Sequence, residues 1–561
     1  MKLQSILNLF LYFLLVGFIT SEEVKKTQGL ESEFDINILG NGLHEAMEMA
    51  IANDGRVFIA ERFGKVKLWS NDGKGELIEV LDLKSDYRGE SGLMGITLDP
   101  NFDQNQWLYL YHSVAIENDK KYHEHHLSRF TLKDSKIDKS SEKILLKVKA
   151  SFVKRIHEAG SLAFGPDGLL YLSVGDNQIR SEYLFSCKTS SNSNDFRGKI
   201  LRIKPTDEGG YEIPKGNLFP VGTEKTKPEI YVMGCRNPFR ISVDSKTGWL
   251  LWGENGPPNN WSGDLKLDKT LLPIGYEEFN LAKEAGYYGY PMIIADNKEF
   301  INYDYAKGKI TNKFSAESPI NNHPGNTGLQ KLPPSKPALI WYEGESAEFP
   351  EFQKGGESAI AGPIYRTSKA FDKEKMIPQR FEGHWFVAEW ARGWVKAVEL
   401  DESGKIETIK PIIPKLKFGK PINLKVGPDG RLYVLYYSKD TSGHLIRLEN
   451  KGVTSEAVAV TNLFETDPMP RKLKKSNAGY KLMKKSDCFA CHQWNHSTIA
   501  PAYIKIAEKY KNSPEMDQTL VSKVKLGGVG VWGHIPMTPH PQHTDEEIKK
   551  MVSTILSIKR K

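Results

Sequence analysis

The chain has 561 residues, which is too long for one ordinary domain and suits two domains of unequal size. A hydrophobic content of 39%, with 11% aromatic residues, is that of a globular protein and excludes a disordered chain. The 77 Lys and Arg against 70 Asp and Glu give a formal charge of +7, too small and too evenly spread to indicate nucleic-acid binding. The 48 glycines and 30 prolines indicate many turns, which favours β-structure.

The N-terminus carries the pattern of an export signal. One basic residue, Lys2, precedes an apolar stretch over residues 6–19, and polar residues follow from Ser21. The charge, length and flank predict a signal peptide over residues 1–21, with an uncleaved membrane anchor as the alternative. No later segment is long and apolar enough to span a bilayer. We therefore expect a periplasmic or secreted protein without a membrane span once the signal is removed.

One pattern recurs over residues 35–449: a turn with Asp and Gly that leads into an alternating strand. The clearest copies are residues 53–60, 165–173 and 427–434, and weaker copies are 99–111, 244–252 and 382–388. Six strand–turn–strand units predict an all-β fold, a six-bladed β-propeller, with a β-sandwich as the alternative. Their irregular spacing, mainly over residues 253–381, predicts long inserted loops, and such loops often build a site.

A polar segment follows the predicted propeller. Residues 450–475 contain Pro468, Pro470 and a cluster of basic residues near position 472. We predict that this segment is a linker without regular structure of its own.

Near the C-terminus, Cys488, Cys491 and His492 form the motif C-x-x-C-H. Two thiols three positions apart can reach both vinyl groups of one porphyrin, and the imidazole of the next residue then lies under the iron. A zinc knuckle would need a second cysteine pair, and none follows Cys491. The motif predicts covalently attached haem c. The other two cysteines, Cys187 and Cys235, could form a disulfide in an exported protein, but the sequence alone does not decide this.

The haem iron needs a second axial ligand, and a methionine thioether is usual for a high-potential haem. Met537 lies in a Gly- and Pro-rich loop, residues 527–539, that can cover a flat ring and hold the side chain rigidly. Met516 lies in a polar turn, and Met551 lies on the apolar face of a predicted helix over residues 546–556. We therefore predict Met537 as the ligand. Four histidines are its chemical rivals: His496, His534, His540 and His543.

The C-terminal residues 476–561 resemble the small class I monohaem cytochromes c of bacteria. The resemblance rests on four segments, residues 499–503, 507–510, 525–533 and 535–537. It implies a small all-α domain in which His492 and Met537 bind the iron and Pro501 packs against the haem.

The ordered motifs of the large domain resemble the glucose/sorbosone dehydrogenase family, six-bladed propellers that use pyrroloquinoline quinone (PQQ). The motifs follow the family's order: residues 89–96, 157–168, 198–202, 234–238, 254–257, 277–281 and 288–291. The resemblance implies that His157 is the catalytic base, since a base must take the hydroxyl proton while the cofactor takes the hydride.

The three carboxylates of the quinone favour a pocket with cations, preferably arginine. Arg236 and Asn237 match family cofactor contacts. Arg366 falls where the family has a lysine, and Lys420 falls near a family arginine. Two positions depart from the family and reduce the positive charge: Glu90 stands where some members have an amide, and Ile422 stands where an arginine is expected.

The family also places calcium beside the quinone, where hard oxygen ligands suit it. Gly256 and Pro257 match the carbonyl donors, and Glu277 and Glu278 match the acidic pair, with ordinary surface charges as the alternative for both acids.

The two resemblances together imply an exported quinohaemoprotein that oxidises a sugar or related alcohol and passes electrons through its haem to a downstream redox acceptor. One alternative is a calcium-dependent, lactonase-type hydrolase. The other is a non-catalytic carbohydrate-binding propeller that carries an electron-transfer cytochrome c domain.

Overall fold

The computed structural model describes two parts of the chain. In the first it describes residues 34–70, 76–119, 121–151, 156–178, 184–258, 274–413, 419–439 and 443–451. In the second it describes residues 473, 476–486, 488, 492, 494, 500–510, 516–528, 537 and 539–558. The chain divides into two compact units, Met1–Ser455 and Glu456–Lys561. The predicted signal peptide and most of the predicted linker lie outside the described residues. Within the described ranges, no helix is long and apolar enough to cross a membrane.

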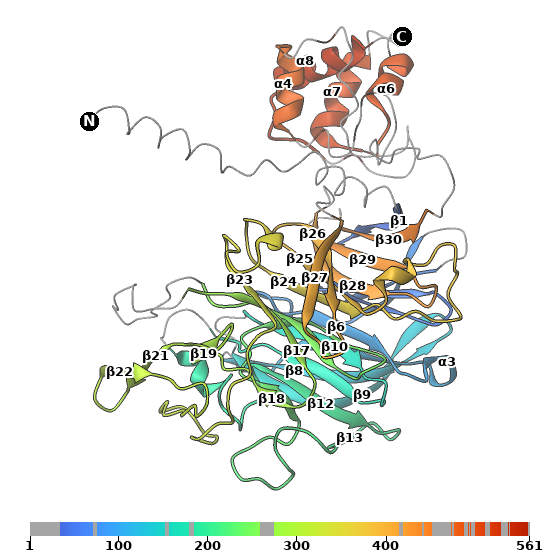
Figure 1. Cartoon of the computed structure of the whole chain (residues 1–561). Coiled ribbons are helices and arrows are strands. Elements are labelled where there is room, and N and C mark those ends of the chain that lie inside the picture. The colour runs from blue at the N-terminus through green and yellow to red at the C-terminus, as the bar shows by residue number, and fades with distance from the viewer. Residues whose placement is uncertain are drawn as a thin grey trace, which may run out of the picture. The chain divides into compact units, whose positions relative to one another are not determined.

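The large unit is built on six blades, five of them four-stranded antiparallel sheets and the third a four-stranded antiparallel core extended by two short strands, which confirms the predicted six-bladed β-propeller (Figure 1). The first three blades contain β2(Ala46–Ile51), β3(Val57–Glu61), β4(Lys65–Trp69) and β5(Leu77–Asp82); β6(Leu93–Leu98), β7(Trp107–Ala115), β8(Tyr122–Lys133) and β9(Lys136–Ser151); β10(Ala159–Phe164), β11(Leu170–Val174), β12(Lys199–Pro205) and β14(Ile230–Met233). The next two contain β15(Pro238–Val243), β16(Leu250–Glu254), β17(Glu277–Ala282) and β23(Ile340–Tyr342); β24(Ala359–Ile364), β25(His384–Glu389), β26(Trp394–Leu400) and β27(Ile406–Ile413).

The sixth blade closes the ring with strands from both ends of the domain. Its strands are β28(Lys420–Val426), β29(Leu432–Tyr437), β30(Gly443–Asn450) and the N-terminal β1(Phe34–Leu43). Strand β1 pairs antiparallel with β30, from Phe34 opposite Asn450 to Leu43 opposite Gly443. This closure ties the first strand of the domain to its last.

The six predicted repeat copies are the segments that lead into the second strand of each blade. In the three clearest copies a glycine makes the turn with a left-handed backbone: φ is +86° at Gly55, +75° at Gly168 and +74° at Gly430. Each glycine N–H donates to the carbonyl three residues earlier, as from Gly55 to Ala52 at 2.9 Å. Only glycine adopts this conformation without a steric penalty, which explains why the turn was readable in the sequence.

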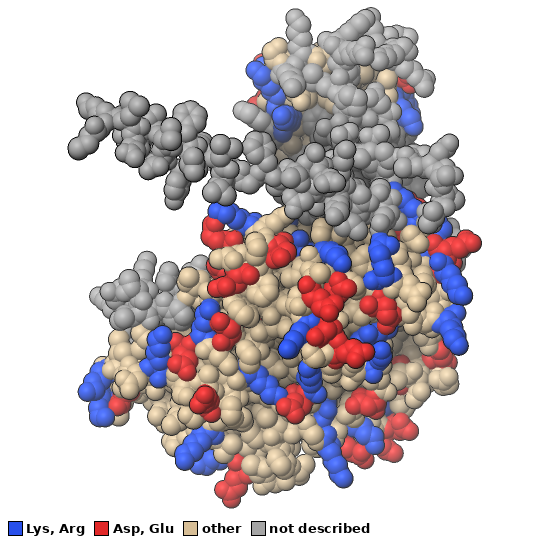
Figure 2. Space-filling view, in the orientation of Figure 1, with Lys and Arg blue, Asp and Glu red and all other residues tan. Residues whose placement is uncertain are grey.

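Long insertions leave the fourth blade, as the irregular spacing predicted. They carry the short strands β18(Gly286–Tyr287), β19(Ile293–Ile294), β20(Lys298–Glu299), β21(Ile301–Asp304) and β22(Lys309–Lys313), while β13(Tyr211–Glu212) extends the third blade. Their apolar residues, including Met292, Ile293 and Phe314, are buried in the largest core cluster. On the face drawn in Figure 2, Lys and Arg side chains are interspersed with Asp and Glu, which agrees with the expectation from the overall charge.

The first strands of successive blades contact one another around the ring. In a propeller these innermost strands run in the same direction along the central axis, so residues just before them share one face. Ser91, Glu158, Asn237 and Ser358 each lie within two residues of such a start. Lys420 opens the first strand of the last blade. We call the face of the propeller on which these residues lie the entry face.

The small unit is helical, as predicted, with α4(Ala478–Lys485), α6(Tyr503–Tyr510), α7(Met516–Leu526) and α8(Asp545–Leu556). Helix α8 contacts the other three helices and buries Met551, which confirms that this methionine belongs to the core. Thr544 and Glu547 form a reciprocal capping box at its start.

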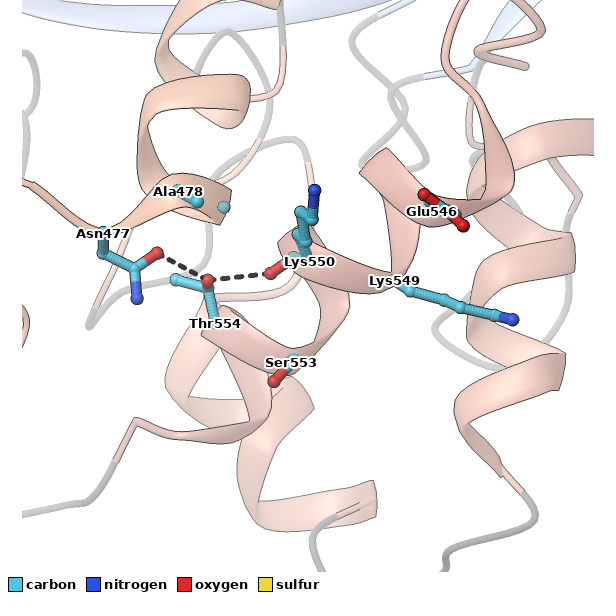
Figure 3. A pocket seen from close by; sticks show the side chains of 8 residues that line it. Asn477, Ala478, Glu546, Lys549, Lys550, Ser553 and Thr554 are labelled. Carbon is cyan, nitrogen blue, oxygen red and sulfur yellow. Dashed lines mark hydrogen bonds between the residues drawn. The ribbon is translucent and has the colours of Figure 1, made fainter.

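Helices α4 and α8 cross closely where Asn477 and Ala478 lie beside Lys550 and Thr554 (Figure 3). A Cβ atom at Gly479 would lie 2.2 Å from both the Lys550 carbonyl oxygen and Thr554 Oγ1. The Thr554 hydroxyl lies 2.8 Å from Asn477 Oδ1, and Asn477 in turn accepts a 3.0 Å bond from the Tyr480 N–H. The shallow hollow beside this crossing is lined by none of the predicted haem ligands.

Candidate functional site

His157 lies on the entry face, two residues before β10 begins. Its Nδ1 is 2.8 Å from Asp176 Oδ1, and Asp176 is itself held by the Ser186 hydroxyl at 2.7 Å and the Gln178 N–H at 3.0 Å. The Asp176 carboxylate therefore fixes the Nδ1–H tautomer of the imidazole and its orientation. No described residue hydrogen-bonds to His157 Nε2, and the side chain is 13% exposed. The arrangement leaves Nε2 available to take a proton.

The backbone of His157 is held in an unusual conformation. Its φ is +55°, and that of Ala159 is +48°. The exposed Glu90 carboxylate accepts the His157 N–H at 2.7 Å. Such left-handed conformations cost free energy in non-glycine residues and persist only where the surroundings hold them. The Glu90 side chain therefore contacts the backbone of His157, the candidate catalytic base.

Asn237 and Arg236 approach His157 from the next blade. Asn237 Oδ1 accepts the Ala159 N–H at 3.0 Å, and the Arg236 carbonyl accepts the Asp176 N–H at 2.7 Å. At Gly175 a Cβ atom would lie 1.7 Å from the His157 carbonyl oxygen, so the close approach requires glycine there. The structure therefore brings His157, Arg236 and Asn237 together, although about eighty positions separate them in the sequence.

The buried carboxyl group of Glu254 holds the backbone of Arg236 and Asn237. Glu254 Oε1 accepts the Arg236 N–H at 2.9 Å and also the Asn237 N–H. Burial, and after it the neighbouring Glu278 carboxylate, raise the pKa of Glu254 to about 8. A protonated Glu254 can still accept both backbone bonds while avoiding repulsion from Glu278.

The two acids predicted to bind calcium point to opposite sides of β17, because neighbouring side chains alternate along a strand. Glu277 Oε1 accepts the Gly256 N–H at 3.1 Å, and its carboxylate faces Arg236. Glu278 instead accepts from Ala295 N–H at 2.6 Å and Asn280 Nδ2 at 3.0 Å. Only Glu277 lies beside Gly256, so the structure does not support the predicted pairing of the two acids around one ion.

The two remaining cations lie at different ends of the propeller. Lys420 is exposed at the start of β28, with its Nζ 3.7 Å from the centre of the Trp390 ring. Arg366 follows β24 and makes two 2.8 Å bonds to Asp244, which follows β15. The strand β24 starts at the entry face, so Arg366 lies roughly 20–25 Å away along it. The prediction that Arg366 contacts the quinone does not fit this placement.

The haem site shows the geometry expected for an iron-binding histidine. His492 Nδ1 lies 2.8 Å from the Pro501 carbonyl oxygen, so Nδ1–H donates there and Nε2 is left for iron. Its ring stacks on Tyr503 with 5.0 Å between centroids. Met537 is fixed by paired backbone bonds with Gly528, of 2.9 and 3.2 Å. Cys488 is described and partly buried, whereas Cys491 lies outside the described residues.

Comparison with known proteins agrees with both halves of this structure. Residues 43–362 match the family described as Glucose / Sorbosone dehydrogenase, and residues 476–559 match the family described as Cytochrome c. The first match covers more than half of the chain. The chain belongs to the glucose/sorbosone dehydrogenase family. It is therefore an oxidoreductase of that family joined to a haem-binding cytochrome c domain.

Individual relatives divide along the same boundary. Quinoprotein glucose dehydrogenase B of Acinetobacter calcoaceticus is 24% identical over 466 residues, which are 77% of this chain and 89% of that protein. Cytochrome c-552 of Hydrogenobacter thermophilus is 42% identical over 82 residues, 15% of this chain and 83% of that protein. The crystal structure of soluble aldose sugar dehydrogenase from Escherichia coli shares the propeller fold, with a TM-score of 0.52 and 20% identity over 74% of this chain and 99% of that one.

Sequence reasoning did not identify two acids of this family member's site, Asp176 and Glu254. Asp176 follows Gly175 at the end of β11, and this Gly-Asp pair after a predicted strand was the available signal. Glu254 belongs to the motif over residues 254–257, but the sequence did not indicate a role for its side chain. The two cysteines left open in the sequence, Cys187 and Cys235, are both buried and unbridged.

Proposed function

We propose that the protein is an exported quinohaemoprotein dehydrogenase, which oxidises an aldose or a related alcohol and passes the electrons one at a time to its haem. The observation that carries the proposal is the Asp176–His157 pair, with Nε2 open on the face where Arg236 and Asn237 also lie. The match of its N-terminus to a signal pattern and the presence of a c-type haem motif support export.

The protein side of the reaction follows from this pair. His157 Nε2 takes the proton of the anomeric hydroxyl, and the Asp176 carboxylate stabilises the imidazolium that forms. When bound, PQQ supplies the acceptor for the hydride that leaves the same carbon. The sugar thereby loses two electrons and two protons and becomes a lactone. A haem held by His492 would take one electron at a time, so a downstream redox acceptor would be needed between the two transfers.

The described residues supply part of what a quinone with several carboxylates needs. Arg236 and Lys420 supply cations on the entry face, and Asn237 supplies an amide. Asn255 Oδ1, beside Arg236, is buried without a hydrogen-bond partner among the described residues and so offers a further polar contact. Ile422 is buried in the core, and its carbonyl accepts the Arg240 side chain at 3.1 Å, so this position contributes no charge.

Calcium would be held by Glu277 and the carbonyl groups of Gly256 and Pro257. Burial raises the pKa of the Glu277 carboxyl well above its usual range, and nearby Glu389 adds to the effect. A bound cation would offset the cost of the buried charge. Glu278 is not part of this site, because its oxygens accept from the Ala295 N–H and from Asn280.

Reconstitution of the purified full chain with PQQ and Ca²⁺ tests the proposal. Aldoses should then reduce the haem, seen in its absorption spectrum, only in the presence of PQQ. His157→Gln should abolish this reduction while dithionite still reduces the haem. If sugars bind but never reduce the haem, and PQQ does not bind at micromolar concentration, the propeller is a carbohydrate-binding module instead.

A further inference from the structure

A buried group of polar side chains lies directly behind His157. The side chain of the next residue, Glu158, contacts His123, His125 and Ser91. His123 and His125 are two positions apart on β8 and therefore project from the same side of the strand. All four residues are at most 3% exposed. None of them belongs to the proposed quinone or calcium site.

The nitrogen and oxygen atoms of this group converge on one point. His123 Nε2 lies 3.1 Å from His125 Nε2, and His125 Nε2 lies 2.6 Å from Glu158 Oε2. Glu158 Oε1 lies 3.8 Å from His123 Nε2, and Ser91 Oγ lies 3.3 Å from the same nitrogen. The ligand atoms of the two histidines and Glu158 all lie within 4.8 Å of one another.

Hydrogen bonds alone do not account for both close contacts of His125 Nε2. If that nitrogen carries a proton, the proton is directed to Glu158 at 2.6 Å and away from His123 Nε2 at 3.1 Å. If His123 Nε2 carries the proton instead, the lone pair of His125 faces the Glu158 carboxylate. In either assignment only one of the two close contacts of His125 Nε2 is a well-directed hydrogen bond, in an interior where an unmade bond is costly.

A metal ion at the centre removes this conflict. Bonds of about 2.0–2.1 Å in a tetrahedral site place neighbouring ligand atoms about 3.3 Å apart, close to the 3.1 and 3.3 Å contacts seen here. We propose that His123, His125 and Glu158 bind a divalent transition-metal ion, foremost Zn²⁺, with Ser91 Oγ or the second Glu158 oxygen as the fourth ligand. Imidazole and carboxylate donors select such an ion over calcium.

The surroundings orient the ligands as metal sites require. His125 Nδ1 lies 3.1 Å from the Ser113 hydroxyl, and its ring stacks on Tyr111 at 5.2 Å with an interplanar angle of 13°. This contact holds the ring so that Nε2 faces the ion. Because Glu158 sits between the left-handed His157 and Ala159, the ion would anchor the backbone that presents His157. The inference concerns metal binding and stands whether or not the propeller is a dehydrogenase.

A second cluster on the other side of the same strands serves as a comparison. His112 lies 3.4 Å from Glu142, and His126 lies 2.9 Å from Glu124. Each histidine there has its own carboxylate, and Lys147 lies 3.3 Å from Glu124. The contacts of this cluster are met by ordinary hydrogen bonds, so His126 is a matched control one position from His125.

The test uses the full chain with its haem, prepared without a polyhistidine tag, loaded with Zn²⁺ and desalted. Elemental analysis by inductively coupled plasma mass spectrometry should give one zinc for each haem iron. His125→Gln and Glu158→Gln should each lower the zinc affinity by well over about 100-fold and so lose the zinc. His126→Gln should keep it. Zinc-edge X-ray absorption of the wild type should show two nitrogen ligands at about 2.0–2.1 Å.

Two results would overturn the inference. One is wild-type protein without stoichiometric zinc after loading. The other is zinc that survives in His125→Gln but is lost in His126→Gln, which would move the site to the second cluster. Loss of the near-ultraviolet circular dichroism would show that a variant fails to fold. The zinc count and the zinc-edge X-ray absorption of the wild type then test the metal site without that variant.

Discussion

Asp176 Oδ1 lies 2.8 Å from His157 Nδ1, and the two residues are 19 positions apart on the two ends of one β-hairpin. The hairpin of β10 and β11 returns the chain to the entry face, so the carboxylate reaches the imidazole from behind. Asp176→Asn should keep the contact but remove the charge and allow the wrong tautomer.

In the reconstituted enzyme, Asp176→Asn should therefore lower kcat for sugar-driven haem reduction by about 100- to 10,000-fold. The affinity for PQQ should change little, because the buried Asp176 carboxylate contacts His157, Ser186 and the Gln178 N–H. Asp167→Asn, in the exposed turn of the same hairpin, is the matched control. Equal rates in the wild type and Asp176→Asn would show that His157 is not the base.

The two candidate arginines should behave differently toward the quinone. Arg236→Lys should weaken PQQ binding by about 10- to 100-fold, since a lysine cannot reproduce bidentate contacts. Arg366→Lys should leave PQQ binding unchanged, because Arg366 pairs with Asp244 at the other end of its strand. Titration calorimetry measures both constants. A loss of PQQ affinity in Arg366→Lys would contradict the placement of the pocket.

Met537 should be the second ligand of the haem iron. Two backbone hydrogen bonds with Gly528 hold the backbone that carries its side chain. Met537→Ala should abolish the near-infrared band of the Met–iron bond in the oxidised protein, and Met537→His should lower the reduction potential. Met551→Leu should alter neither. A band that persists in Met537→Ala would assign the ligand to another residue.

The crossing of α4 and α8 should tolerate no side chain at Gly479. Gly479→Ala places a methyl group 2.2 Å from the Lys550 carbonyl oxygen, which should destabilise the haem domain by about 1–3 kcal/mol despite the better helix propensity of alanine. Thermal unfolding followed by haem absorbance measures the change. Ser553→Ala, at an exposed position of α8, should shift stability by no more than about 0.5 kcal/mol.

His323 should make the propeller sensitive to acid. Its Nδ1 accepts the Gly325 N–H at 2.9 Å, and burial, followed by the nearby Lys188, lowers the pKa of His323 to about 4. An unfolded histidine has a pKa of about 6.5, so between these values the unfolded chain binds more protons than the folded one. Stability should therefore rise with pH across this window and be lost as pH falls from about 6.5 to 4.

The loss of unfolding free energy attributable to His323 over this window should be about 1–2 kcal/mol, because solvent screens a group that is not fully buried. His323→Asn keeps an acceptor for Gly325 but does not titrate. Urea denaturation of both proteins at pH 7 and pH 4.5, followed by tryptophan fluorescence, should show a smaller acid loss in the variant. Identical pH dependence would mean that other groups cause the acid sensitivity.

The sequence by itself determined the propeller architecture and the presence of a cytochrome c domain with a haem-attachment motif. The Asp-Gly turns were readable because only glycine accepts the left-handed backbone at Gly55, Gly168 and Gly430. C-x-x-C-H was readable because haem attachment fixes the spacing of the two cysteines and the histidine, whereas Met537 as iron ligand stays a prediction. Family order then placed His157, Arg236 and Asn237 in one domain.

Only the tertiary structure decided which of these residues meet. Asp176 reaches His157 because a hairpin folds back, and Glu158 meets His123 and His125 because two blades pack side by side. Arg366 carries the right charge but lies at the wrong end of its strand, and Glu278 faces away from Glu277. Residue type and order are local properties of a chain, whereas strand direction, side-chain alternation and blade packing set distances between residues far apart in sequence.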